Sequence, residues 1–342
     1  MIPAFFTPQP GWPERIERIV ELVGRVSALD EVSRQRLELR RSSRIGSVHS
    51  STAIEGNRLT LAQVASVARG ESVLAPPRDV KEVENALAAY DALESLDPWS
   101  VDDFLRAHGL LTGGLVAESG AFRTVGVEIV NADGDVLHTG SVVGKVPRLV
   151  AELLEWGRTC ADHPIVVSSA VHFLIEYVHP FRDGNGRIGR LWQTLILARW
   201  RPLFAWMPTE SLVRQRQDGY YRALQDSHEP EIDAAAFISY MIEVIADALT
   251  TYEARAVENA TDVGVNVGAN VGVSDAILAL LREEPTLSAQ RLAVRLDKTS
   301  RTIERHLSTL KAEGRLRRDG PAKAGRWVVV EPARPDGSAG SV

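Results

Sequence analysis

The sequence predicts a mainly α-helical protein with one β-hairpin and a C-terminal winged helix-turn-helix. Three observations support this fold class. Residues 164–178 and 187–200 are apolar stretches that read as buried helices, alternation with period two surrounds Asp133-Gly134, and residues 274–331 show helical patterns followed by a basic hairpin. The 342 residues, 44% of them apolar, can form two or three domains.

The expected segments are an N-terminal helical region (1–95), a helical core (96–255), a linker (256–273), the winged helix (274–331) and a flexible tail (332–342). The N-terminus lacks the pattern of a signal peptide, and the longest apolar stretch, 191–207, carries two arginines, so we expect no membrane span. Cys160 is the only cysteine, which excludes an internal disulfide and favours a cytoplasmic location.

Residues 51–57 (STAIEGN) have the features of a helix C-terminus. Ser51 and Glu55 are four residues apart, which is one helical turn, and Gly56-Asn57 is a typical stop signal. A carboxylate at this end of a helix is unfavourable to the helix dipole. We therefore expect Glu55 to have a partner elsewhere in the chain; the alternative is an ordinary helix end.

A β-hairpin is predicted after residues 120–123 (GAFR). Val125, Val127 and Ile129 alternate with other residues, NADG (131–134) supplies the turn, and the alternation then resumes.

The segment 179–190 (HPFRDGNGRIGR) joins the two predicted apolar helices. Gly184 and Gly186 allow backbone conformations closed to other residues, and the amides that begin the second helix can bind an anion. Arg187 and Arg190 are three positions apart on one helix face, so both guanidiniums can reach that anion.

Two other side chains in this segment suit phosphate chemistry. Asp183 is a hard oxygen ligand of the kind that Mg²⁺ takes alongside substrate phosphates. His179 titrates near neutral pH and suits general-base work on a hydroxyl. A glycine turn, a histidine or an arginine pair means little alone, but together they predict a site that binds a polyphosphate and activates a hydroxyl.

The segment resembles the HPFx(D/E)GN(G/K)RxxR signature of the Fic family, and every position of that signature is matched. The resemblance implies an all-helical core that moves AMP from ATP onto a Ser, Thr or Tyr hydroxyl of a protein and releases pyrophosphate. His179 would deprotonate that hydroxyl, and Asp183 would hold Mg²⁺. The groups implied to meet the phosphates are the amides of Gly184 and Gly186, Asn185 at the α-phosphate, and Arg187 and Arg190 at the β- and γ-phosphates.

The resemblance also gives residues 51–57 a role, because they match the (S/T)xxxE(G/N) inhibitory motif found in many Fic proteins. It implies that Glu55, in a motif that begins at Ser51, pairs with Arg190 and removes the guanidinium needed for the γ-phosphate. In some relatives the equivalent glutamate also serves removal of AMP from the target. The hairpin resembles the Fic flap, which pairs with a target's backbone as an added strand; a plain surface hairpin is the alternative.

The amino-acid composition of the chain changes after about Glu253. Residues 263–273 (VGVNVGANVGV) are a low-complexity near-repeat, which we interpret as linker. Their valines favour strands, so pairing in a homodimer is the alternative. Three helices are expected in the winged helix-turn-helix, at 274–282, from about 288, and at 300–312.

The charge of this module supports DNA binding. Residues 274–331 carry twelve Lys/Arg against eight Asp/Glu, or +4, although the whole chain has a net charge of −6. In such folds the third helix enters the major groove, so Arg301 and Arg305 are candidate contacts, and Arg317 would meet backbone phosphates. Winged helices also bind proteins, and that alternative stays open.

Two classes of function follow. The first is a protein adenylyltransferase restrained by Glu55, acting on a target protein or on itself. The second is a DNA-binding transcriptional regulator whose Fic core senses nucleotide. An intact His179 favours the enzyme, because sensing needs no general base. The complete RxxR favours ATP as the donor, although variants of the fold use other donors or transfer a phosphate group.

Overall fold

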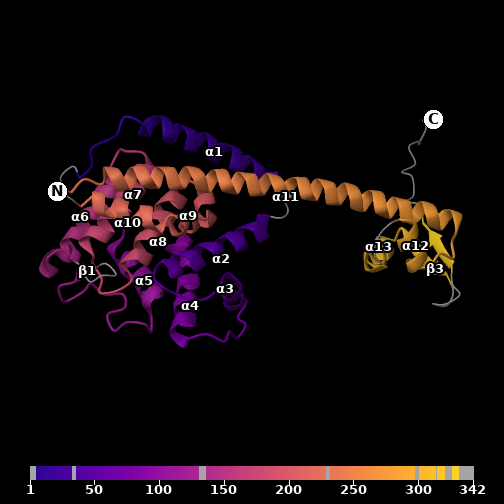
Figure 1. The fold of residues 1–342 in the computed structure, drawn as a ribbon, viewed down its shortest axis with the longest axis horizontal. Helices are drawn as coiled ribbons and strands as arrows, with labels where there is room; N and C mark the ends of the chain where they lie inside the picture. Colours follow the sequence, from indigo (N-terminus) through magenta and orange to yellow (C-terminus); the bar gives the residue numbers. More distant parts are fainter. Residues whose placement is uncertain are drawn as a thin grey trace, which may run out of the picture. The chain divides into compact units, whose positions relative to one another are not determined.

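The protein is described from a computed structural model, which covers residues 5–32, 36–130, 136–228, 232–296, 300–312, 314–319 and 326–330. The chain divides into two compact units, Met1–Ala256 and Val257–Val342. Helices predominate over strands in the described residues, and the mainly α-helical fold class is confirmed (Figure 1).

The N-terminal part of the first unit is helical, as predicted. α3 begins with a capping box in which Thr60 and Gln63 each bond the other's backbone, and α5 begins after Ser100, whose side chain accepts from the amide of Asp103. The helices are α1 (Trp12–Val32), α2 (Arg36–Ile54), α3 (Leu61–Ala68), α4 (Pro77–Asp91), η1 (Leu93–Ser95) and α5 (Val101–Thr112). Because α2 ends at Ile54, Glu55 lies just past its C-terminal end.

The predicted hairpin is present. β1 (Glu128–Val130) and β2 (Val136–Thr139) pair antiparallel, with Glu128 opposite Thr139 and Ile129 opposite His138. The predicted turn, 131–134, lies outside the described residues. After the hairpin the chain enters η2 (Val143–Lys145) and α6 (Val146–Thr159).

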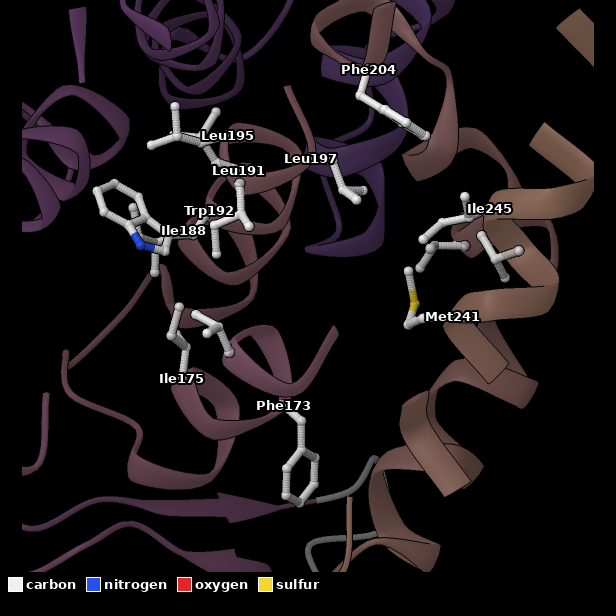
Figure 2. Packing of buried hydrophobic residues seen from close by; sticks show 14 of the residues in the cluster. Phe173, Ile175, Ile188, Leu191, Trp192, Leu195, Leu197, Phe204, Met241 and Ile245 are labelled. Atoms are coloured by element: carbon white, nitrogen blue, oxygen red, sulfur yellow. The ribbon is translucent and has the colours of Figure 1, made fainter. Parts of the chain in front are cut away.

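α7 (Pro164–Val178) and α8 (Asn185–Trp200) form the centre of the first unit. Most of their side chains are buried, so their apolar residues run around the helix rather than along one stripe, as expected of helices enclosed by others. Figure 2 shows Ile188, Leu191 and Trp192 of α8 in this core. The loop between α7 and α8 is therefore held at both ends by largely buried helices.

The rest of the first unit closes this core through η3 (Pro202–Trp206), α9 (Thr209–Gln215), α10 (Gln217–Asp226) and the first part of α11 (Ala235–Glu283). Met241 and Ile245 of α11 are both buried in the cluster (Figure 2). The stretch Ala235–Ala254 is long and apolar enough to cross a membrane, but 56% of it is buried. Burial of these side chains identifies the stretch as a core helix.

Residues 256–273, predicted as a linker, are helical, because α11 continues through them to Glu283. The near-repeat 263–273 is helical, which differs from the extended conformation that the alternative of strand pairing requires. No proline interrupts 235–283, and a helix already formed gains one hydrogen bond for each residue added. The module's predicted first helix, 274–282, is the end of α11.

The second unit has the predicted winged helix-turn-helix elements. After α11 come α12 (Ala289–Arg295), α13 (Ser300–Ala312), β3 (Leu316–Asp319) and β4 (Arg326–Val329), and the two strands pair antiparallel. A separate apolar core holds them together, formed by Ile277, Leu281, Leu292, Ile303, Leu307, Leu310, Leu316 and Trp327 among others. The predicted tail, 332–342, lies outside the described residues.

Candidate active site

The loop between α7 and α8 is bracketed by two residues in the left-handed region. α7 ends at His179, which has a φ of 50°, a conformation costly for a side chain other than glycine. Gly184, with a φ of 88°, precedes α8, and a Cβ there would lie 2.9 Å from Thr112 Cγ2. The tight loop therefore requires glycine at 184, as predicted.

Phe181 anchors the loop in the apolar core. Its ring is buried and stacks on His108, with ring centroids 3.6 Å apart. His108 Nε2 donates to the carbonyl of Asp183 at 2.9 Å, and its Nδ1 accepts from the amide of Gly120 at 3.1 Å. Burial, aided by the charge of Arg187, lowers the pKa of His108 to about 4, so the ring is neutral at physiological pH.

Asn185 braces the same loop. Its Oδ1 accepts from the amide of Phe181 at 2.9 Å, and its Nδ2 donates to the carbonyl of Phe181 at 2.8 Å. The side chain is buried. Both ends of the carboxamide are thus used within the loop, whereas the resemblance implied that Asn185 acts on the α-phosphate.

Arg123 ties the hairpin to the loop. Its backbone amide donates to the carbonyl of Pro180 at 3.0 Å, and its Nε donates to the carbonyl of His179 at 2.7 Å. Its remaining guanidinium nitrogens donate to the carbonyls of Val125 and Ser141, on the two sides of the hairpin. One buried guanidinium therefore fixes both arms of the hairpin beside His179.

Arg190 is bound by the predicted inhibitory segment. Its Nη2 donates to Glu55 Oε1 at 2.7 Å and to the carbonyl of Ser51 at 3.0 Å, while its Nε donates to Ser51 Oγ at 3.1 Å. The Arg190 side chain is 2% exposed and that of Glu55 is 28% exposed. The partner expected for Glu55 from its place at a helix end is therefore Arg190.

The Glu55 carboxylate lies against the first turn of α8. A Cβ at Gly186 would overlap Glu55 Oε1 and would come within 3.0 Å of Arg190 Nη1. The N-terminal turn of a helix favours negative charge, through its unpaired amides and the helix dipole. Glu55 thus lies where the sequence predicts that a phosphate would bind.

Asp183 has the environment of a partly exposed carboxylate between two cations. Its Oδ1 accepts from Arg187 Nη2 at 2.9 Å, and its Oδ2 lies 3.8 Å from Arg78 Nη2. Within the described part of the chain, no group of three or more acidic, histidine or cysteine side chains could hold a metal. Asp183 is 38% exposed and fits Mg²⁺ in the mode that combines one protein carboxylate with substrate phosphates.

Close to Arg190 lies a largely buried polar cluster that contains His172, Glu176, Gln193 and Tyr220. His172 bonds Gln193 through Nδ1 at 2.7 Å and the Tyr220 hydroxyl through Nε2 at 3.1 Å. Burial lowers the pKa of His172 to about 3. Burial also raises the pKa of Glu176 to about 7, opposed by the charge of Arg190 and reinforced by that of Glu55.

The structure brings the predicted segments 179–190 and 51–55 into direct contact. Sequence reasoning missed three supporting residues: Arg123 as a tether, His108 as a loop ligand, and Glu82, which pairs with Arg187. They lie 56 to 105 residues from their partners in the chain, and no local pattern marks such contacts.

A sequence model of the Fic/DOC family matches residues 98–197. A crystal structure of a Fic family protein from Desulfovibrio desulfuricans G20 superposes with a TM-score of 0.71 at 34% identity, over 96% of this chain and 99% of that one. This chain belongs to the Fic family. As a Fic protein it carries the complete signature on the α7–α8 loop.

Curated relatives of this Fic protein include "Protein adenylyltransferase Fic" of Culex quinquefasciatus, 25% identical over 70% of this chain and 47% of the relative. "Protein adenylyltransferase fic-1" of Caenorhabditis elegans is 30% identical over 44% of this chain and 31% of the relative. The Fic chain thus spans half or less of the length of these curated relatives.

A second sequence model, of an HTH domain, matches residues 274–319. Arg305 on α13 and Arg317 on β3 are both exposed, as a nucleic-acid contact requires. Arg301 lies in the first turn of α13, and its side chain is outside the described residues. The guanidinium of Arg318 packs over the Trp327 ring at 4.8 Å, which places a further cation on the β3–β4 hairpin of the second unit.

Proposed function

We propose that this Fic protein is an adenylyltransferase that transfers AMP from ATP to a hydroxyl of a protein. The hydroxyl oxygen attacks the α-phosphorus, its proton passes to His179, and the bond to the β-phosphate breaks to release pyrophosphate. Support comes from relatives that carry this activity in their names and from the complete signature. Attack at phosphorus needs positioning and charge neutralisation, which this loop can supply.

His179 suits the role of general base by its tautomer as well as its place. Its Nδ1 lies 3.3 Å from the carbonyl of Glu176, and a carbonyl can only accept, so the proton belongs on Nδ1. The acceptor lone pair is then on Nε2. Arg123 donates to the backbone carbonyl of His179 and so fixes the position of this residue relative to the β1–β2 hairpin.

Mg²⁺, when bound between Asp183 and the phosphates, would neutralise charge on the leaving pyrophosphate. The amides of Gly184 and Gly186 would bind the phosphates at the N-terminus of α8. Arg190 would hold the γ-phosphate, but only after it leaves Glu55.

The observation that carries the proposal is the Arg190–Glu55 pair, because it joins the signature to the inhibitory motif that accompanies it in Fic transferases. We propose that the protein is autoinhibited by this pair, and that Glu55 can also serve removal of AMP from the target. The test is incubation of Glu55→Gly protein with Mg²⁺ and ATP labelled at the α-phosphate. Greater self-labelling than wild type is expected, and labelling equal to that of wild type would refute inhibition.

DNA binding by the winged helix is a second proposal, supported by the match to an HTH domain and by the exposed Arg305 and Arg317. It is compatible with the first, because the module could bring the transferase to DNA or to a target protein. It also admits a regulator whose Fic core only senses nucleotide. The His179→Ala variant distinguishes the transferase from the nucleotide sensor. A transferase labels protein with AMP and loses that labelling in the variant, whereas a sensor produces no AMP labelling in either protein.

A further inference from the structure

Arg187 is held between two carboxylates. Its Nη1 donates to Glu82 Oε1 at 2.5 Å, and its Nη2 donates to Asp183 Oδ1 at 2.9 Å. Only 5% of the Arg187 side chain and 14% of the Glu82 side chain are exposed. Both terminal nitrogens of this guanidinium therefore face protein carboxylates, whereas the resemblance implied that they face phosphate.

Glu82 is itself fixed on its other side. Its Oε2 accepts from Asn57 Nδ2 at 2.8 Å, and the same nitrogen donates to the carbonyl of Asp79 at 2.9 Å. Asn57 Oδ1 accepts from the amide of Leu59 at 3.0 Å, so the carboxamide is also held at its other end. Glu82 thus occupies a rigid, largely buried position with a bond on each of its oxygens.

We propose that Glu82 is a positioning residue for Asp183, acting through Arg187. Glu82 fixes the guanidinium, and the guanidinium orients the carboxylate that would hold Mg²⁺. This inference rests on the proposed function and assigns Arg187 to Asp183 rather than to the phosphates. Hydrogen-bond partners behind a metal ligand fix its orientation, and losing one typically weakens metal binding by about 10- to 100-fold.

The burial of Glu82 argues against a role as a second inhibitory carboxylate. Glu55 has 28% of its side chain exposed, whereas Glu82 has 14% exposed and is anchored by Asn57. Glu82 could release Arg187 only by giving up hydrogen bonds in a partly dehydrated site. Arg78, the other cation near Asp183, is 3.8 Å away and 73% exposed, so it cannot replace Arg187 as a rigid support.

The test compares Glu82→Gln with the parent, both carrying Glu55→Gly so that Arg190 is available. Two quantities are measured over a Mg²⁺ series at saturating ATP: the initial rate of AMP transfer and the rise in Tm. We expect the half-maximal Mg²⁺ concentration to rise about tenfold in both, while the Kd for ATP in EDTA changes by less than about twofold. Glu84→Gln is the matched control, because Glu84 lies on the same helix, is 52% exposed and contacts only Lys81 among the described ion pairs.

An unchanged Mg²⁺ requirement in Glu82→Gln would overturn the proposal. An ATP affinity in EDTA that rises about tenfold would also overturn it, because Glu82 would then be competing with phosphate for Arg187. Should Glu82→Gln fail to fold, Glu82→Asp and Asn57→Ala are expected to raise the Mg²⁺ requirement by smaller factors, and no change in either contradicts the proposal. The Tm readout needs no transfer, so a parent that binds Mg²⁺ and ATP without labelling refutes the proposed function and still tests Glu82.

Discussion

Arg190 and Glu55 form a 2.7 Å ion pair in which the guanidinium is almost fully buried. Burial by itself would lower the pKa of Arg190, but the charge of Glu55 and neighbouring groups raises it above its ordinary value. The arginine therefore stays charged and needs an anion beside it. An uncompensated buried charge is costly, so Glu55 is expected to leave only when another anion takes its place.

Ser51 contributes to this pair, since its hydroxyl accepts from Arg190 Nε at 3.1 Å. Ser51→Ala removes one bond and leaves Glu55 in place, so we expect self-labelling with ATP to rise by roughly threefold to tenfold, corresponding to about 1 kcal/mol. The increase should be smaller than that of Glu55→Gly. Ser50→Ala is the control, because Ser50 bonds Ser211 instead; a rise of the same size there would argue against a specific role.

His179→Ala should abolish AMP transfer in the Glu55→Gly background and spare ATP binding. The imidazole is assigned to the proton of the target hydroxyl, while the phosphates would be bound by the amides at the start of α8 and by Arg190. Labelling and calorimetric titration with ATP measure the two properties separately. Transfer that survives the substitution would remove His179 from the mechanism.

The largely buried Glu176, whose side chain is 14% exposed, predicts a pH dependence of stability. Its pKa is raised to about 7 from the ordinary 4.5, mainly by burial, so the folded state holds the proton after the unfolded state has lost it. The contribution of Glu176 to stability therefore falls as pH rises from about 4.5 to about 7 and is level above. We therefore compare the free energy of urea unfolding of Glu176→Gln with that of wild type. The difference should shift in favour of the variant by up to about 3 kcal/mol between pH 5 and pH 8. A difference that is constant across this range would contradict the assignment.

The winged helix gives a prediction that is independent of catalysis. If α13 and the hairpin contact DNA, gel-shift affinity should fall steeply with salt, and Arg317→Ala should weaken binding to all sequences similarly while reducing the salt slope by about one. Arg305→Ala on α13 should instead alter sequence preference if it reaches base edges. No binding at low salt would favour a protein partner for this module.

The parts of the site that lie on one continuous stretch of sequence could be predicted. His179, Asp183 and Arg190 sit within a short segment between two helices, and their spacing fixes which of them share the loop and which share a helix face. The C-terminal end of α2 could also be predicted, because Gly56-Asn57 is a helix stop signal. The same signal predicts that the Glu55 carboxylate lies at this end and needs a partner from another segment.

The supports of the site could not be predicted in this way. Glu82 meets Arg187 and Arg123 meets His179 through folding of distant segments, and nothing near either residue in sequence distinguishes it from an ordinary surface charge. The helical conformation of 256–273 could not be predicted for a different reason. Glycine, asparagine and valine are individually poor helix formers, so the composition of this segment disfavours a helix. The segment is nevertheless part of α11, because a helix already formed gains a hydrogen bond with each residue added.

The most direct test of an autoinhibited AMP transferase is mass spectrometry of cell lysate incubated with ATP, Mg²⁺ and one of three proteins: wild type, Glu55→Gly, or Glu55→Gly with His179→Ala. The expected result is the mass of one AMP on a Ser, Thr or Tyr residue with the Glu55→Gly protein, little of it with wild type, and none with the double variant. Equal AMP modification in all three, or a different added group, would contradict the assignment.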